Sequence, residues 1–212
     1  MAGSDQTSIY HITHVDNLAT IVAKGGLLCD RRVADHGLAK VGIAHQHIKK
    51  RRAQRPVPID PSGTLDDYMP FYFAPRSPML YTIVRGNVDG YTGGQRSVVH
   101  LVSSAETIAD ASLPFVFTDG HADVALSDYF VDLGDLAKVD WTIMAETYWT
   151  DTDEDGDRKR RRQAEFLVHQ FVPWSLVARI GVLDTRMVDR VVEVVGAGAD
   201  KPFVTVEAGW YY

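Results

Sequence analysis

One acidic residue, Glu165, lies at the start of an apolar stretch, where a charged side chain is unusual. Glu165 directly follows the basic stretch RKRRRQA and opens an apolar, strand-like run that continues to residue 172. Period-two alternation places Glu165 on one face of this strand with Leu167 and His169, so its side chain points into the sheet's buried or cleft side if that face is inward. A carboxylate there requires a partner or a chemical purpose. Two interpretations are open: an ion pair with an arginine of the neighbouring run, or a place in a functional site.

Two basic stretches favour a polyanionic ligand in a chain whose formal net charge is −6. They cover residues 47–55 and 158–162, and both fall in long loop regions. Such patches favour contact with phosphates, and a solvated charged surface is the alternative. The acidic run 151–157 faces the second stretch and can neutralise it within a hairpin or loop. Aromatic residues of the same loops either stack bases or belong to the core, namely Tyr129, Phe130, Trp141, Tyr148 and Trp149.

Metal-site patterns in this chain are incomplete. The run 151–157 matches the opening of a calcium-binding EF-hand loop, but position twelve is Arg162, and a cation cannot replace the bidentate glutamate required there. The three histidines between residues 36 and 47 lack a fourth zinc ligand, because the lone Cys29 is not placed to complete the set. We therefore expect no metal.

The familiar motifs of nucleotide binding and hydrolysis are missing from the sequence. It contains no G-x-S-x-G elbow, no G-x-x-x-x-G-K-[ST] loop and no G-x-G-x-x-G after a strand. Any cofactor is therefore held without a Walker or Rossmann loop. His11 and Thr13 share a strand face with Ile9, where a structural, hydrogen-bonded histidine is the plain interpretation.

Composition indicates one domain. A chain of 212 residues with 45% hydrophobic residues can bury one substantial core, so we expect a single domain over 1–212 with residues 1–8 flexible. The acidic balance argues against a protein that coats nucleic acid uniformly. Cys29 is the only cysteine, so no intramolecular disulfide forms and the cytoplasm is the expected location. No apolar run approaches the roughly 20 residues of a membrane span, so no membrane contact is expected.

The order of strand and helix signals predicts a β-rich α+β fold. Strands are expected at 9–13, 70–74, 79–84, 97–103, 164–172, 179–183 and 204–208. Helices are expected between Thr13 and Gly25, near 42–54 and at 184–195. A capping-box-like pair, Thr13 and Asp16, starts the first helix. Regions 30–66 and 110–164 are expected to be mostly irregular, and long loops on a strand scaffold usually form a site.

Five sequence blocks occur in order along the chain. They are IYHITHVDNL, HIKKRR, VPI followed by DDYMPFYFAPRSPMLY, GGQRSVVHL and RRRQAEFLVHQFVP. Together they resemble the DarT toxins, bacterial enzymes that attach ADP-ribose from NAD to bases of single-stranded DNA. The similarity runs from about residue 9 to the closing WYY. It implies an ADP-ribosyltransferase fold, a split β-sandwich with a central NAD cleft and flanking helices.

The resemblance also implies roles for individual residues. Glu165 matches the catalytic glutamate, and Arg51 matches the arginine of the HIKKRR block, with Arg52 as the alternative one position on. His11 is implied to bind the ribose, and Thr13 the nicotinamide amide. The further implied NAD-binding positions are Asn17, Arg51, Tyr72, Ser77 and Met79, with Arg76 in the same segment. The implied DNA-binding positions are Lys49, Arg52, His121, Arg158 and Arg162.

The implied chemistry explains these residue types. Cleavage of the nicotinamide–ribose bond develops positive charge on the ribose carbon, which a fixed carboxylate at Glu165 stabilises. Arg51 is implied to bind the pyrophosphate and to polarise the incoming base, while region 30–66 meets NAD and substrate and region 110–164 recognises the substrate. Because arginine stays protonated, His121 is the alternative proton acceptor.

The implied function is transfer of ADP-ribose from NAD, as co-substrate, to a base of single-stranded DNA. Thymidine is the expected acceptor and guanosine the alternative base. An ADP-ribosyltransferase acting on protein or RNA, and a non-enzymatic module that binds single-stranded nucleic acid, are the other readings. The implied partners are single-stranded DNA and the antitoxin DarG, whose macrodomain removes the DNA modification.

Overall fold

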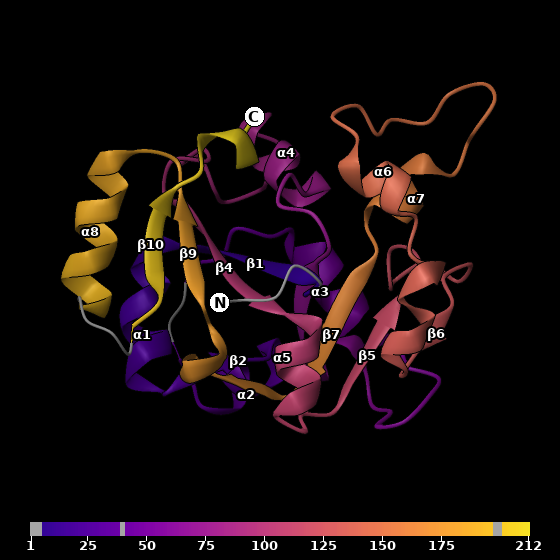
Figure 1. The fold of residues 1–212 in the computed structure, drawn as a ribbon, viewed down its shortest axis with the longest axis horizontal. Helices are drawn as coiled ribbons and strands as arrows, with labels where there is room; N and C mark the ends of the chain where they lie inside the picture. The colour runs from indigo at the N-terminus through magenta and orange to yellow at the C-terminus, as the bar shows by residue number, and fades with distance from the viewer. Residues whose placement is uncertain (1–5, 39–40, 197–200) are drawn as a thin grey trace.

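The computed structural model describes residues 6–38, 41–196 and 201–212. The expected flexibility of residues 1–5 lies outside this range, while Ser8 already begins the first strand. The architecture is the expected α+β arrangement, a large sheet with flanking helices (Figure 1). Among the described residues, no helix is long and apolar enough to cross a membrane.

Eight strands form one sheet in the order β10-β9-β4-β1-β3-β7-β5-β6. Their bounds are Ser8–His14 (β1), Tyr68–Tyr72 (β3), Val98–Ser104 (β4), Phe115–Thr118 (β5), Tyr129–Phe130 (β6), Glu165–His169 (β7), Arg179–Val182 (β9) and Phe203–Val206 (β10). The β9–β10 pair is parallel, and the other pairs are antiparallel. A second sheet pairs β2 (Gly26–Leu28) with β8 (Phe171–Pro173).

The large sheet divides between β1 and β3. β1 is in register with β4 along seven residue pairs, from Ser8 opposite Ser104 to His14 opposite Val98, whereas it meets β3 in the single pair Tyr10–Tyr72. The strands therefore separate on either side of Tyr72, which gives the split that the resemblance implies. One half holds β10, β9, β4 and β1, and the other holds β3, β7, β5 and β6.

Short helices cover the sheet and form its rims. They are α1 (Leu18–Ala23), α2 (Asp30–Asp35), α3 (Gln46–Arg52), α4 (Pro78–Val84), α5 (Ala105–Asp110), α6 (Trp141–Ala145), α7 (Arg158–Arg162) and α8 (Thr185–Val195). Figure 1 shows α8 beside β10 at one side and α6 with α7 at the opposite side, beyond β7. The expected helix at 184–195 is confirmed, because buried Met187, Val191 and Val195 recur at helical spacing on one face.

The strand expected at 79–84 is wrong, because this segment is helix α4. Pro78 occupies its first turn, and the Ser77 hydroxyl caps it by accepting from the Leu80 backbone N–H at 3.1 Å. Leu80 and Ile83 are buried while Tyr81 is exposed, which is helical and not alternating spacing. The cap and the proline therefore outweigh the β-branched composition.

Other boundaries also differ from expectation. The expected capping pair of Thr13 and Asp16 is wrong. His14 caps the short 3-10 turn Val15–Asn17 that leads into α1, because its Nδ1 accepts from the Asp16 N–H at 3.2 Å, while Thr13 Oγ1 accepts from Asn17 Nδ2 at 3.0 Å. The strand expected at 164–172 is interrupted at Gln170, where a positive φ of 62° turns the chain from β7 into β8. The two sheets are joined through this turn.

The two long regions are more ordered than the sequence indicates. Region 30–66 holds α3, which was expected, and also α2, which buries no residue and so leaves no apolar stripe in the sequence. Region 110–164 contributes β5 and β6 to the large sheet, together with α6 and α7. Because β5 lies between β7 and β6, this region builds the sheet beside Glu165.

Candidate active site

Glu165 is a buried carboxylate at the start of β7, with a relative exposure of 3%. Arg52 Nη1 donates to its two carboxylate oxygens at 2.9 and 3.2 Å. The Ala122 backbone N–H donates to Oε1 at 3.1 Å. The alternative of an ion pair with the neighbouring basic run is therefore wrong, because the partner is Arg52 of α3.

Tyr72 connects Glu165 to the line where the sheet splits. It lies opposite Glu165 in the β3–β7 register and opposite Tyr10 in the β1–β3 register. Burial, with a further contribution from the Glu165 charge, raises the pKa of the Tyr72 phenol, so it stays protonated. The catalytic candidate thus sits at the junction of the two half-sheets, where the backbone opens.

A cavity of about 240 Å³ opens at this junction and is lined by both Glu165 and Tyr72. Its remaining polar lining residues are Asp30, His45, Lys49, Arg52, Thr82, His121 and Gln163. A second cavity of about 120 Å³ is lined by His11, Thr13 and Asn17. Lys49, Tyr72 and Met79 are among the residues that line both, so the two cavities form one cleft along the split.

Three expected NAD-binding residues of the first strand and helix are brought together in this cleft. His11 Nδ1 lies 2.9 Å from the Pro70 carbonyl, and since a carbonyl only accepts, Nδ1 carries the proton. Asn17 exchanges two hydrogen bonds with the Val41 backbone, at 2.8 and 3.0 Å, and also donates to Thr13. Asn17 therefore holds the backbone at Val41 against β1.

Adjacent arginines at the end of α3 point to different places. Arg51 forms an ion pair with Asp123, its side chain is 58% exposed, and it does not line either cavity. Arg52 is 14% exposed and lies on Glu165. Although burial opposes its charge, the Glu165 carboxylate raises the pKa of Arg52. The geometry therefore favours the alternative register, in which Arg52 and not Arg51 is the arginine beside Glu165.

Arg52 also retains a donor for a ligand. Its Nη2 is buried and has no hydrogen-bond partner among the described residues. His45 Nδ1, on a residue lining the same cavity, is likewise buried without a partner there. A buried guanidinium N–H without a partner is costly, so Arg52 Nη2 fits a ligand that carries acceptor oxygens, such as the phosphates of NAD, and His45 Nδ1 can donate to the same ligand in the tautomer that carries its proton.

Met79 lines the cleft as expected, but Ser77 does not. The Ser77 hydroxyl is 1% exposed and is occupied in capping α4. Arg76 turns away from the cleft, since its Nε donates to the Tyr211 carbonyl at 2.9 Å and its guanidinium lies over the Tyr212 ring. Ser77 and Arg76 therefore support the cleft through α4, which carries Met79 on its first turn.

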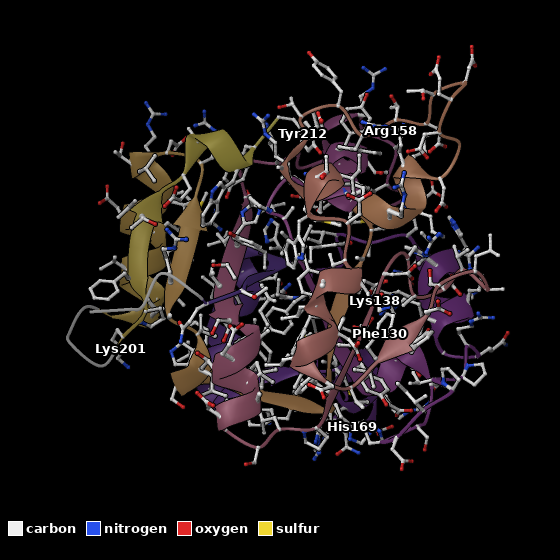
Figure 2. The ribbon with its side chains drawn as sticks, turned by 45° about the vertical axis from the view of Figure 1, so that its right-hand side comes forward. Phe130, Lys138, Arg158, His169, Lys201 and Tyr212 are labelled. Carbon is white, nitrogen blue, oxygen red and sulfur yellow. The ribbon has the colours of Figure 1, made fainter. Side chains whose placement is uncertain are left out.

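The basic run 158–162 is largely neutralised. Arg160 pairs with Asp119 and Asp157, Arg161 pairs with Asp140 and Asp155, and Lys159 pairs with Asp151. Neutralisation by the acidic run 151–157 is confirmed. Arg158 donates to the Tyr148 and Thr150 carbonyls, at the end of the molecule where Figure 2 labels both Arg158 and Tyr212.

The DNA-binding role expected of Arg162 is wrong. Arg162 is 3% exposed, and its guanidinium donates to the carbonyls of Ile143, Met144 and Arg76 at 2.5 to 2.9 Å. These bonds tie α6 to the segment that precedes α4. A buried guanidinium with three backbone acceptors has a structural role, because it cannot reach a phosphate.

Two further expected DNA-binding residues, Lys49 and His121, line the cleft beside Glu165. Lys49 Nζ lies 3.3 Å from Asp30 Oδ2. Sequence reasoning missed Asp30, His45, Thr82 and Gln163 as lining residues. His45 alone carried a signal, since it precedes Lys49 by one helical turn. Among the described residues, no group of three or more metal-ligating side chains is placed to hold an ion.

A split sheet with a buried glutamate at its junction and a continuous cleft beside it is the arrangement that the resemblance implies for an ADP-ribosyltransferase. The family model described as "ssDNA thymidine ADP-ribosyltransferase, DarT" matches residues 10–212. The chain belongs to this family, the DarT family.

Sequence relatives agree with this assignment over nearly the whole chain. A DNA ADP-ribosyl transferase of Thermus aquaticus is 44% identical over 208 residues, which is 97% of this chain and 89% of the relative. One from Thermus sp. is 42% identical over 210 residues, covering 98% of this chain and 97% of the relative.

Solved structures show the same fold. Thermus sp. 2.9 DarT in complex with ADP-ribosylated single-stranded DNA superposes with a TM-score of 0.91 at 40% identity, covering 100% of this chain and 99% of the other. The same DarT in complex with NAD⁺ has a TM-score of 0.85 at 39% identity, covering 98% of both chains.

Proposed function

We propose that this protein transfers ADP-ribose from NAD to thymidine in single-stranded DNA and releases nicotinamide. The observation that carries the proposal is the buried Glu165 carboxylate at the split of the sheet, held by Arg52 and lining the cleft. The solved relatives, whose complexes hold NAD⁺ and ADP-ribosylated DNA, support the donor and the acceptor.

Glu165 acts on the charge that develops as the nicotinamide bond breaks. A carboxylate that is 3% exposed is screened little by solvent or salt, so its field acts strongly on a nearby ribose carbon. The Ala122 N–H and the Arg52 guanidinium fix the carboxylate before the substrate arrives. This preorganisation favours the transition state over the ground state.

Arg52 is proposed to hold the donor. The Arg52 guanidinium donates to Glu165 through Nη1. Its Nη2 is buried without a partner among the described residues and is available to a phosphate or a carbonyl oxygen. His11, with its ring fixed by the Pro70 carbonyl, and Thr13, fixed by Asn17, line the more distant part of the cleft. They are proposed to contact the ribose and the nicotinamide amide, and Tyr72 and Met79 to pack on the nicotinamide.

The acceptor must be unpaired, because a base within a duplex cannot bring its ring nitrogen to the ribose carbon. We further propose a DarG macrodomain antitoxin as the cognate partner and the bacterial cytoplasm as the site of action. A Thermosipho africanus relative, described as a DNA ADP-ribosyl transferase–DNA ADP-ribosyl glycohydrolase fusion protein, supports a pairing of the two activities. This chain spans 42% of that relative.

The test is mass measurement of oligonucleotides incubated with the protein and NAD. A thymidine-bearing single strand should gain one ADP-ribose, and the same strand in a duplex should not. Replacing each base in turn separates thymidine from guanosine as acceptor. Failure to modify any oligonucleotide would leave the protein- and RNA-directed transferases and the non-enzymatic binding module as the surviving functions.

A further inference from the structure

Transfer to thymidine requires a proton acceptor. The thymine ring nitrogen carries a hydrogen that must leave as the bond to the ribose carbon forms, and an imide N–H is not lost spontaneously at neutral pH. General-base catalysis by a positioned side chain typically contributes about 10²- to 10⁴-fold to such a step. This inference rests on the proposed function and concerns which side chain takes the proton.

The cations and the tyrosine of the cleft are unsuited to the task. Lys49 and Arg52 are each paired with a carboxylate, and the Glu165 charge raises the pKa of Arg52 despite its burial. Arg52 therefore stays protonated, and the Lys49 ammonium is engaged with Asp30. Burial likewise raises the pKa of Tyr72, whose phenol keeps its own proton.

The carboxylates of the cleft are already committed. Glu165 accepts three hydrogen bonds, two from Arg52 and one from Ala122, and its proposed role is to face the ribose. Asp30 lies 3.3 Å from the Lys49 ammonium and forms an ion pair with it. The remaining candidates among the lining residues are His45 and His121.

His45 lies among cations and is less suited to act as a base. It is the N-cap residue just before α3, and it lines the cavity together with Lys49 and Arg52 of that helix. A proton on His45 would add to two neighbouring positive charges. These surroundings suit anionic phosphates better than the uptake of a proton.

His121 comes from the loop between β5 and β6 and is fixed next to Glu165. Its own N–H donates to the Arg160 carbonyl at 2.9 Å, and its carbonyl accepts from the Ser127 hydroxyl at 2.8 Å. The N–H of the next residue, Ala122, donates to Glu165. The backbone is thus held on both sides of His121, and the imidazole is left with its side-chain rotations only.

We propose that the His121 imidazole is the general base that removes the ring proton of thymine during ADP-ribose transfer. As the ribose carbon bonds to the thymine nitrogen, its bond to the nicotinamide nitrogen breaks, and that electron pair leaves with neutral nicotinamide. The proton from thymine passes to a ring nitrogen of His121. The imidazolium then returns the proton to solvent, so the net products are ADP-ribosylated DNA, nicotinamide and a proton.

The charged groups around His121 allow this cycle. Burial lowers the pKa of His121, so the imidazole is neutral and ready to accept at neutral pH. Glu165 and Asp123 favour the imidazolium, while Arg52 and Arg51 oppose it. Arg160, which packs on Gly120, is itself paired with Asp119 and Asp157. Glu165 can therefore stabilise both the ribose cation and the transient imidazolium.

The decisive experiment changes the acidity of the acceptor. An oligonucleotide in which 5-bromo-2′-deoxyuridine replaces the target thymidine keeps a methyl-sized substituent but loses its ring proton more readily. His121→Gln should lose roughly 10²- to 10⁴-fold of the transfer rate on thymidine and regain tenfold or more of it on the bromo base. The rate at which His121→Gln modifies thymidine should also rise with pH well above neutrality, whereas the wild-type rate should stay constant there.

Two matched variants separate a base from a structural role. Glu165→Gln should lose transfer on both bases equally, and His45→Gln should show the wild-type ratio between the two bases. A His121→Gln variant that transfers to thymidine at the wild-type rate, or loses equally on both bases with an unchanged pH profile, overturns the inference. If wild type modifies neither oligonucleotide, the proposed function has failed instead.

Discussion

Neighbouring side chains at the end of α3 have opposite surroundings although they are one position apart. Arg51 faces solvent and pairs with Asp123, while Arg52 is buried on Glu165. On a short helix, one residue corresponds to a rotation of about 100°, so a shift of one position exchanges the cleft for the surface. The sequence block HIKKRR contains both arginines and cannot distinguish them.

We predict that Arg52→Lys lowers ADP-ribose transfer by about 10²- to 10³-fold, because an ammonium cannot span both Glu165 oxygens and also leave a donor for the substrate. Arg51→Lys should change the rate less than threefold, since exposed ion pairs contribute about 0–1 kcal/mol. Initial rates with a thymidine oligonucleotide measure both. Equal losses in the two variants would show that the donor site extends to Arg51.

At the scale of elements, α7 directly precedes β7, the strand that carries Glu165. Its partly buried cations Arg160 and Arg161 are matched by nearby aspartates, and its buried cation, Arg162, joins α6 to the segment before α4. β7 begins three residues later and runs toward His169, at the opposite end from Arg158 in Figure 2. The helix therefore sets the position from which Glu165 enters the sheet.

Arg162→Met should destabilise the fold by about 3 kcal/mol, because three buried carbonyls lose their donor. For a chain of this size the midpoint of thermal unfolding should fall by roughly 6–12 °C. Lys159→Met, on the exposed side of the same helix, is the matched control and should shift it by no more than about 2 °C. If Arg162→Met unfolds like wild type but binds DNA weakly, Arg162 contacts DNA after all.

At the scale of the whole molecule, alternation and helical spacing were sufficient to predict most of the sheet. The strands β1, β4, β7 and β9 and helix α8 follow from their own residues, and Glu165 points inward as the alternation indicates. What local patterns could not predict depends on distant contacts. Glu165 and Arg52 are 113 positions apart, and α2 is held by the bonds of Arg31 to Asp66 and Asp67.

The acid sensitivity of the fold should depend in part on His100, which is fully buried in β4 and whose Nε2–H donates to the Pro75 carbonyl, 3.0 Å away. Burial lowers the pKa of His100 to about 4. Between about pH 6.5 and pH 4 the His100 side chain therefore binds a proton in the unfolded chain but not in the folded chain. The free energy of unfolding falls as the pH falls through this range.

Over that window His100 should cost about 3 kcal/mol of unfolding free energy, at about 1.4 kcal/mol per pKa unit. Denaturant unfolding at pH 7 and at pH 4.5 measures the loss. His100→Gln should be less stable than wild type at pH 7 but should lose less on acidification. An identical pH dependence in both proteins would mean that other groups account for the acid sensitivity.

The central claim is that the buried carboxylate at the split of the sheet promotes transfer of ADP-ribose to DNA. The most direct measurement compares wild type with Glu165→Gln, which keeps the side-chain shape and removes the charge, using the mass of a thymidine oligonucleotide incubated with NAD. We predict that transfer falls by at least about 10²- to 10³-fold while the affinity for the oligonucleotide is retained. Transfer by Glu165→Gln at close to the wild-type rate would contradict the account.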